Sequence, residues 1–173
     1  MLNFSNLLRQ IRGTLVVGML LCAFTLTGCQ SSQLQTMRSL NKAQIAVLKQ
    51  EGFTETAGAW TFGLWDKLLF RTDEDKLTPE SRRTIERIGR SLLAVGRVHL
   101  RVLGYTDSSG KDLYNNSLSE RRAAAVVDAL VGAGMTPGNI QRRGLGSRNP
   151  ISDNLTAEGR AQNRRVAIIV VAE

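Results

Sequence analysis

The stretch "GYTDSSGKDLYNNSLSERR", residues 104–122, joins a strand pattern to a helix pattern. Apolar residues recur at every second position before it, at Val98, Leu100 and Val102, which is typical of a strand that ends at Gly104. Apolar residues recur at helical spacing in and after it, and the pattern stops near residues 132–134. A strand, a loop and a helix in this order predict one unit of an α/β fold.

The remaining elements repeat this alternation. Asn41 is a candidate helix cap with Gln44 at the capping-box position, and Thr78 is another cap, followed by Pro79. We expect helices at 42–51, at 79–95, through 118–130 with an end near 132–134, and at about 157–165. We expect strands at 60–65 with 67–70 as a continuation, 98–104, 139–144 and 166–171. The order β-α-β-α-β-(α)-β predicts an α/β (α+β) sandwich with helices packed on a mixed sheet, in which the nearly continuous apolar strand 166–171 is an inner strand.

Two charged residues of the opening stretch need an explanation. Arg122 lies four residues after Leu118 and four before Val126, on the helical face that should be buried. A buried arginine needs an anionic partner, and Asp107, just past the strand end, is the nearest candidate. The two residues either form a structural ion pair or flank a pocket and divide a zwitterionic ligand between them. Arg121 faces elsewhere and is interpreted as a surface arginine.

The N-terminus has the pattern of a secretory signal. Arg9 and Arg12 precede the apolar run "TLVVGMLLCAFTL", residues 14–26, which is shorter than the roughly 20 residues of a membrane span. An amphipathic or buried helix is the alternative for this run. The next residues, "LTGC" at 26–29, resemble a bacterial lipobox, which implies that Cys29 is lipidated and begins the mature chain. In such lipoproteins, a glutamine such as Gln30 after the cysteine indicates the outer membrane.

The chain therefore divides into a signal peptide (1–28), a lipidated tether (29–41), a helix with a linker (42–58) and a main domain (59–173). Its net charge is +8, but an exported chain meets anionic lipid and cell wall, so we expect no nucleic-acid partner. His99 is the only histidine and no thiol is left after lipidation, which argues against an enzyme, a metal site or another cofactor. The sequence leaves the oligomeric state open, a homodimer included.

Three motifs in order, "GYTDSSG", "YNNSLSERRA" and "NRRVAI", resemble the OmpA-like peptidoglycan-binding domain over about residues 60–173. This resemblance implies that Asp107 holds the ammonium group and Arg122 the carboxylate of diaminopimelate in the wall peptide. Tyr105 stands where the family usually has histidine, so it can form a hydrogen bond but does not titrate near neutral pH. The resemblance gives further ligand-contacting positions at Asp73, Thr106, Gly110, Asn115 and Arg164.

A narrower resemblance lies upstream, where "AQIAVLKQEGF" and "WTFGLWDKLLF" are similar to the YfiB-type regulatory lipoproteins. It implies capture of a YfiR-like periplasmic repressor, which releases a YfiN-type diguanylate cyclase and favours biofilm formation through cyclic di-GMP. The alternative function is a structural tether of the Pal type, with no regulatory partner. The expected partner-binding residues are apolar, and the alternative is that they belong to the core: Ile45, Leu48, Phe53, Trp60 and Phe62.

Overall fold

The structure is a computed structural model that describes residues 40–56, 58–65, 69–70, 74–96 and 98–171. The signal peptide, Cys29, most of the tether and Asp73 lie outside the described residues. The helices are α2 (Lys42–Gln50), α4 (Pro79–Ala94), α5 (Asp112–Gly132) and α6 (Ala157–Asn163), with a short 3₁₀ turn at Pro137–Asn139. The strands are β1 (Thr54–Thr56), β2 (Ala59–Trp65), β3 (His99–Tyr105), β4 (Ile140–Gly144) and β5 (Arg165–Val171). None of the helices in these ranges is long and apolar enough to cross a membrane.

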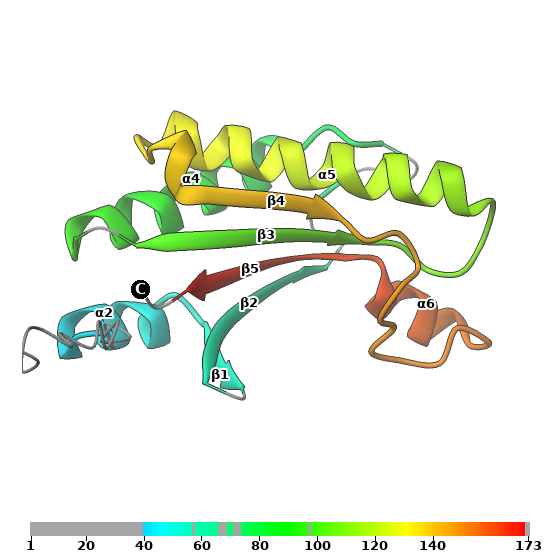
Figure 1. The fold of residues 1–173 in the computed structure, drawn as a ribbon, viewed down its shortest axis with the longest axis horizontal. Helices are drawn as coiled ribbons and strands as arrows, with labels where there is room; N and C mark the ends of the chain where they lie inside the picture. The colour runs from blue at the N-terminus through cyan, green and yellow to red at the C-terminus, as the bar shows by residue number, and fades with distance from the viewer. Residues whose placement is uncertain (1–39, 57, 66–68, 71–73, 97, 172–173) are drawn as a thin grey trace, which may run out of the picture. The chain divides into compact units, whose positions relative to one another are not determined.

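The five strands form one mixed sheet in the order β1-β2-β5-β3-β4. β3 and β4 are parallel, whereas the other neighbouring strands are antiparallel. The α4 and α5 helices lie together on one side of the sheet (Figure 1). The predicted α+β class is confirmed, and so is the inner position of β5 between β2 and β3. The three-residue strand β1 was not predicted.

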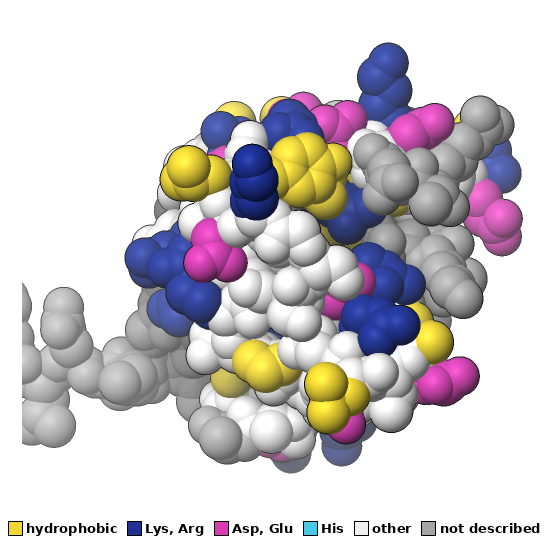
Figure 2. All heavy atoms as spheres, turned by 90° about the vertical axis from the view of Figure 1, so that its right-hand side faces the viewer, with side chains coloured by type: hydrophobic (Ala, Val, Ile, Leu, Met, Phe, Trp, Pro, Cys, Tyr) yellow, Lys and Arg dark blue, Asp and Glu magenta, His cyan; other side chains and the backbone are white. Residues whose placement is uncertain are grey.

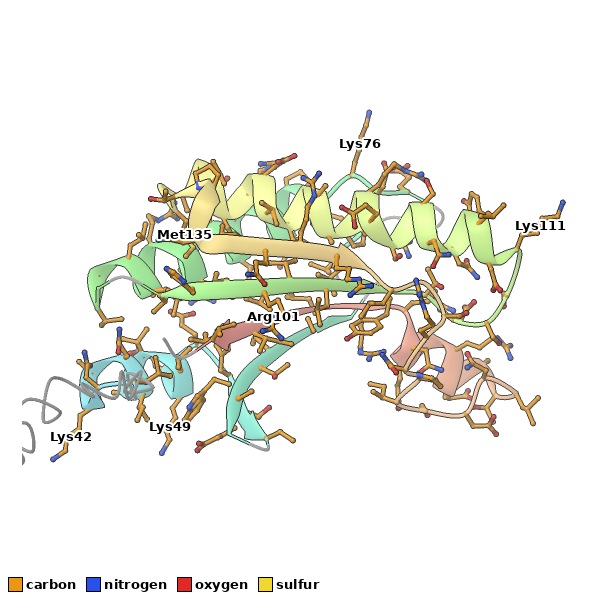
Figure 3. The ribbon with its side chains drawn as sticks, in the orientation of Figure 1. Lys42, Lys49, Lys76, Arg101, Lys111 and Met135 are labelled. Carbon is orange, nitrogen blue, oxygen red and sulfur yellow. The ribbon has the colours of Figure 1, made fainter. Side chains whose placement is uncertain are left out.

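The core lies between the sheet and the α4–α5 layer. Alternate residues of the inner strands point into it, including Val102 and its cross-strand partner Ile168, both fully buried. The predicted stripe of α4 is buried at Ile85, Ile88 and Leu92. The opposite face of the sheet carries the intervening residues, such as the exposed Arg101 of β3 (Figure 3). The alternating apolar side chains of the strands therefore pack against the apolar stripe of the helices and form one core layer.

Two glycines let α5 lie directly against the sheet. A Cβ on Gly104 of β3 would lie 2.1 Å from the backbone oxygen of Ser119, and one on Gly144 of β4 would lie 2.4 Å from the amide nitrogen of Glu120. The Ser119 hydroxyl then accepts a hydrogen bond from the Gly146 amide at 3.0 Å. This close approach fixes the height of α5 above the ends of β3 and β4, and with it the position of the residues in its first turns.

The N-terminal segment packs on the same core. Asn41 and Gln44 form the predicted capping box of α2. Glu51, at the end of this helix, has a buried carboxylate that accepts a hydrogen bond from Arg87 of α4. Of the expected partner-binding residues, Leu48, Phe53 and Trp60 are buried in the core, whereas Ile45 and Phe62 are partly buried against it. In this conformation the first three side chains belong to the core rather than to the surface.

The predicted strand extension at 67–70 is wrong for Phe70. Its backbone forms an isolated bridge with Leu77, outside the sheet. Phe70 is 3% exposed, so this apolar residue belongs to the core instead of extending a strand.

Candidate functional site

The ends of β3 and β5 bring two distant segments together. The strands are antiparallel and pair Tyr105 with Arg165. The chain leaves β3 towards Asp107 at the same end of the sheet where it enters β5 from Arg164, so the register places these residues next to each other. Arg164 Nη1 donates to Asp107 Oδ2 at 2.6 Å, across 57 residues of sequence.

This end of the domain also holds the start of α5 and all of α6 (Figure 1). Lys111 marks the point where the loop after β3 enters α5 (Figure 3). In the view onto this end, polar side chains and backbone occupy the middle, and charged and apolar side chains surround them (Figure 2). The exposed apolar residues of α5 and of the loop before α6 are Leu113, Tyr114, Ile151 and Leu155.

The loop at 106–110, called the site loop below, is held by its own side chains. Asp107 Oδ1 accepts from the Ser109 amide at 2.8 Å, which is the Asx-turn expected for this residue type. Gly110 adopts φ 85°, a conformation that favours glycine. The buried Asn115 of α5 donates from Nδ2 to the Ser109 carbonyl at 2.8 Å and to the Asp107 carbonyl at 3.4 Å. Through these two hydrogen bonds, helix α5 holds the site loop in place.

Asp107 is an ionised and nearly buried carboxylate, with the residue 8% exposed. Burial raises its pKa, but the hydrogen bonds from Arg164 and Ser109 lower it more, so the pKa of Asp107 lies below its ordinary value of 3.8. A carboxylate has about four lone-pair positions. Within the described residues Arg164 donates to Oδ2, the Ser109 amide donates to Oδ1, and the Ser109 side chain is a further hydrogen-bond partner of the carboxylate. These three partners leave about one lone-pair position for a ligand donor.

Thr106 adds a second polar group at the same place. Its amide donates to the Gly146 carbonyl at 2.8 Å, which ties β3 to the turn after β4. Its hydroxyl oxygen is the buried side-chain polar atom in the described ranges that lacks a hydrogen-bond partner. A buried hydroxyl without a partner costs free energy, so a ligand group that binds it would recover that cost.

Arg122 is buried as predicted, at 3% exposure, but it does not pair with Asp107. Its Nε donates to the Glu74 carbonyl at 3.2 Å, and its guanidinium lies 5.0 Å from the ring centre of Phe70. The structural ion pair of Asp107 with Arg122 is therefore wrong, because the register of β3 with β5 pairs Asp107 with Arg164 instead. Arg121 is a surface residue as predicted, and it pairs with Asp75 at 2.5 Å.

Tyr105 is covered by the residue that follows Arg164. The Arg165 guanidinium lies 3.7 Å from the centre of the Tyr105 ring, and Tyr105 is 8% exposed. Arg165 also donates to the backbone carbonyls of Asn149 and Asn163. At this position the tyrosine ring supplies an aromatic face for a cation–π contact with an arginine.

Two asparagines of the site were missed from the sequence. Asn163 is completely buried and lies beside Arg164 in the "NRR" motif, and Asn154 lies in the loop before α6. Asn154 Oδ1 accepts from the Ser108 amide at 3.1 Å. Asparagine is common in polar loops, so nothing in the sequence marked Asn154 as part of the site. Asn163 could have been found from its position in the "NRR" motif. The described residues contain no group of three or more histidine, cysteine, aspartate or glutamate side chains placed to hold a metal ion.

Comparison with known proteins places the domain in a family. Residues 69–164, more than half of the chain, match the OmpA family. The outer-membrane lipoprotein YfiB of Pseudomonas aeruginosa is 48% identical over 86% of this chain and 87% of its own length. The lipoprotein YfiB of Escherichia coli is 42% identical over 90% of this chain and 96% of its own length. The name of the Pseudomonas aeruginosa relative states an outer-membrane lipoprotein, which agrees with the location expected from the sequence.

A solved structure agrees with the fold. The cell wall anchor of the type VI secretion system from Pseudomonas aeruginosa has a TM-score of 0.63 and 28% identity, and the match covers 79% of this chain and 99% of that one. The chain therefore belongs to the OmpA family, together with the YfiB lipoproteins.

Proposed function

We propose that this chain binds peptidoglycan through the Asp107 site and grips the zwitterionic end of diaminopimelate in the stem peptide. The observation that carries the proposal is the state of Asp107: nearly buried, ionised, and hydrogen-bonded by Arg164 and Ser109 with about one lone-pair position left. A carboxylate in this state favours an ammonium group over a neutral donor, because charge-assisted hydrogen bonds are about twice as strong as neutral ones. The cell wall anchor with the same fold supports a wall ligand.

The carboxylate of the ligand would bind to an arginine of the same site. Arg164 is the more accessible arginine, with its side chain 28% exposed, and Arg122 lies on α5 two turns after Asn115. The Thr106 hydroxyl is a further polar group of the proposed site, and Asn115 supports the site by holding the site loop through its two hydrogen bonds. Asp73 remains part of the proposal, although it lies outside the described residues.

The test is co-sedimentation with purified wall sacculi. We expect Asp107→Ala to abolish binding, because loss of one side of a buried charged pair costs roughly 2–5 kcal/mol. Asp128→Ala, an exposed aspartate of α5, is the matched control and should bind normally. Sacculi with lysine in place of diaminopimelate should bind weakly, because lysine lacks the second carboxylate. Normal binding by a folded Asp107→Ala protein would contradict the site.

We infer a second function for the α2–β1–β2 segment: capture of a YfiR-like periplasmic repressor, which would activate a YfiN-type diguanylate cyclase and biofilm signalling. The observation in its favour is the part of the chain over which the YfiB relative is similar. The OmpA family match begins at residue 69, but the YfiB match of 148 residues is too long to fit after that point. The similarity to YfiB therefore includes the N-terminal segment.

The candidate contact residues at the surface are Ile45 and Phe62, which are partly buried against the core. Leu48, Phe53 and Trp60 would take part only if α2 left its place on the domain, because they are buried. The test is a pull-down with a YfiR-like repressor. We expect capture by the wild type, weaker capture by an Ile45→Ala, Phe62→Ala double variant, and unchanged capture by Leu113→Ala at the far end. No capture by the wild type would favour the Pal-type tether.

A further inference from the structure

We propose that Asn154 is a positioning residue of the wall-binding site: its side-chain oxygen braces the site loop against the loop that enters α6. The proposal rests on the proposed binding of peptidoglycan by Asp107. The loop at 149–156 is called the brace loop below, and it contacts the site loop through Asn154. Hydrogen bonds and one close backbone contact hold the brace loop against Asn163 and α6.

The base of the brace is Asn163, which has no exposed surface. Its Oδ1 accepts from the amides of Ile151 and Ser152, at 2.8 and 3.0 Å. Its Nδ2 donates to the Ser152 carbonyl at 2.8 Å and to Asn154 Oδ1 at 3.0 Å. The two donors and both lone pairs of this amide are therefore used, so the side chain has one orientation and holds the first half of the brace loop in place.

The other end of the brace loop is fixed by α6. A Cβ on Gly159 would lie 1.9 Å from the Asp153 carbonyl oxygen, so the helix lies directly on the loop backbone. Arg160 donates from Nη1 to the carbonyls of Asn154 and Leu155, at 2.9 and 3.0 Å. The α6 helix therefore fixes the backbone position of Asn154, and this restricts where the Asn154 side chain can lie.

The link to the ligand site runs through two consecutive amides. The Ser108 amide donates to Asn154 Oδ1 at 3.1 Å, and the Ser109 amide donates to Asp107 Oδ1 at 2.8 Å. The first bond fixes the peptide that follows Asp107, and the second needs that peptide in place to close the Asx-turn. Asn154 thus orients the carboxylate without touching the ligand. A preorganised loop binds more tightly because less conformational freedom is lost on binding.

The experiment uses the full chain and the soluble peptide L-Ala-γ-D-Glu-diaminopimelate-D-Ala, with affinity measured by calorimetry. We expect Asn154→Ala to weaken binding roughly three- to tenfold, the size of effect that loop ordering produces. Asn154→Asp keeps an acceptor oxygen for Ser108 and should restore most of the affinity. Asn139→Ala, at the opposite end of β4, is the control and should bind like the wild type. Repeating the series at high salt shows whether the restored affinity is only a long-range effect of the added charge.

Amide hydrogen exchange in the unliganded protein gives an independent measurement. We expect faster exchange at Ser108 and Ser109 in Asn154→Ala than in the Asn139→Ala control, and partial recovery in Asn154→Asp. Wild-type affinity in Asn154→Ala, or equal weakness of the alanine and aspartate variants, would overturn the brace. If the wild type does not bind the peptide, the proposed function fails, and unchanged exchange at Ser108 would then overturn the brace separately.

Discussion

Arg164 Nη1 and Asp107 Oδ2 lie 2.6 Å apart at the ends of two neighbouring antiparallel strands. The pair lies between water and the protein core, with the side chains 28% and 11% exposed. This intermediate position explains how one pair can be both ordered and available to a ligand. It also connects the protonation of Asp107 with the stability of the domain.

The first prediction concerns pH. Because the pKa of Asp107 is lower in the folded protein than its ordinary value of 3.8, ionisation of Asp107 stabilises the fold above that value. This contribution is lost as the pH falls below 3.8 and through the pKa of the folded state. We expect Asp107→Asn to be less stable than the wild type near neutral pH, with a difference that shrinks in this acidic window. Urea unfolding across the pH range measures it, and a constant difference would contradict the assignment.

The second prediction concerns the contact of α5 with the sheet. A Cβ at Gly104 would lie 2.1 Å from a backbone oxygen that cannot move without displacing α5. We expect Gly104→Ala to reduce the free energy of unfolding by about 3 kcal/mol or more, at the upper end of overpacking effects. The control is Gly63→Ala in β2, where a Cβ meets nothing within 4 Å. Chemical denaturation should show no loss for the control, since alanine is favoured over glycine in a strand.

The third prediction separates the two adjacent arginines of α5. Arg122 is buried and contacts Phe70 and the Glu74 carbonyl, whereas Arg121 pairs with Asp75 at the surface. We expect Arg122→Ala to lower the free energy of unfolding by about 2–4 kcal/mol, from a lost charged hydrogen bond and a lost cation–π contact. Arg121→Ala should cost less than about 1 kcal/mol. Equal losses in thermal and chemical unfolding would refute the distinction.

The fourth prediction tests the lipid anchor. Cys29 follows the residues that resemble a lipobox. We expect Cys29→Ser to remove the protein from the outer-membrane fraction, because the acyl chains that hold a lipoprotein in the bilayer would be missing. Membrane fractionation and metabolic labelling with a fatty acid provide the measurements, and Cys22→Ser, within the predicted signal peptide, is the control. Labelled, membrane-bound Cys29→Ser protein would exclude the anchor.

Local patterns were sufficient for most elements. The caps at Asn41 and Thr78 and the strand at 166–171 appear in the structure where the sequence predicts them. These features depend on residues within a few positions of one another, so a single sequence contains the necessary information. Strand β1 was missed because its three residues are all exposed and polar, without an apolar pattern to mark it.

The candidate site was only partly predictable. The motifs point to Asp107, Thr106, Asn115 and Arg164 as one candidate site. The structure shows that these residues lie close together, and their role in binding stays a prediction. The brace formed by Asn154 and Asn163 was missed, because a hydrogen bond between two loops leaves no periodic signal. The apolar residues of α2 and β2 were ambiguous for a related reason: core and partner surface have the same composition, and only packing separates them.

The sequence by itself determined most of the elements and their order, because periodicity, capping and motif residues act over short distances. The tertiary structure decided which arginine meets Asp107. The sequence pointed to Arg122, which is closer along the chain, but the register of β3 with β5 selects Arg164, 57 residues away. The partner of a charged side chain depends on distance in space, and in a sheet that distance is set by strand pairing.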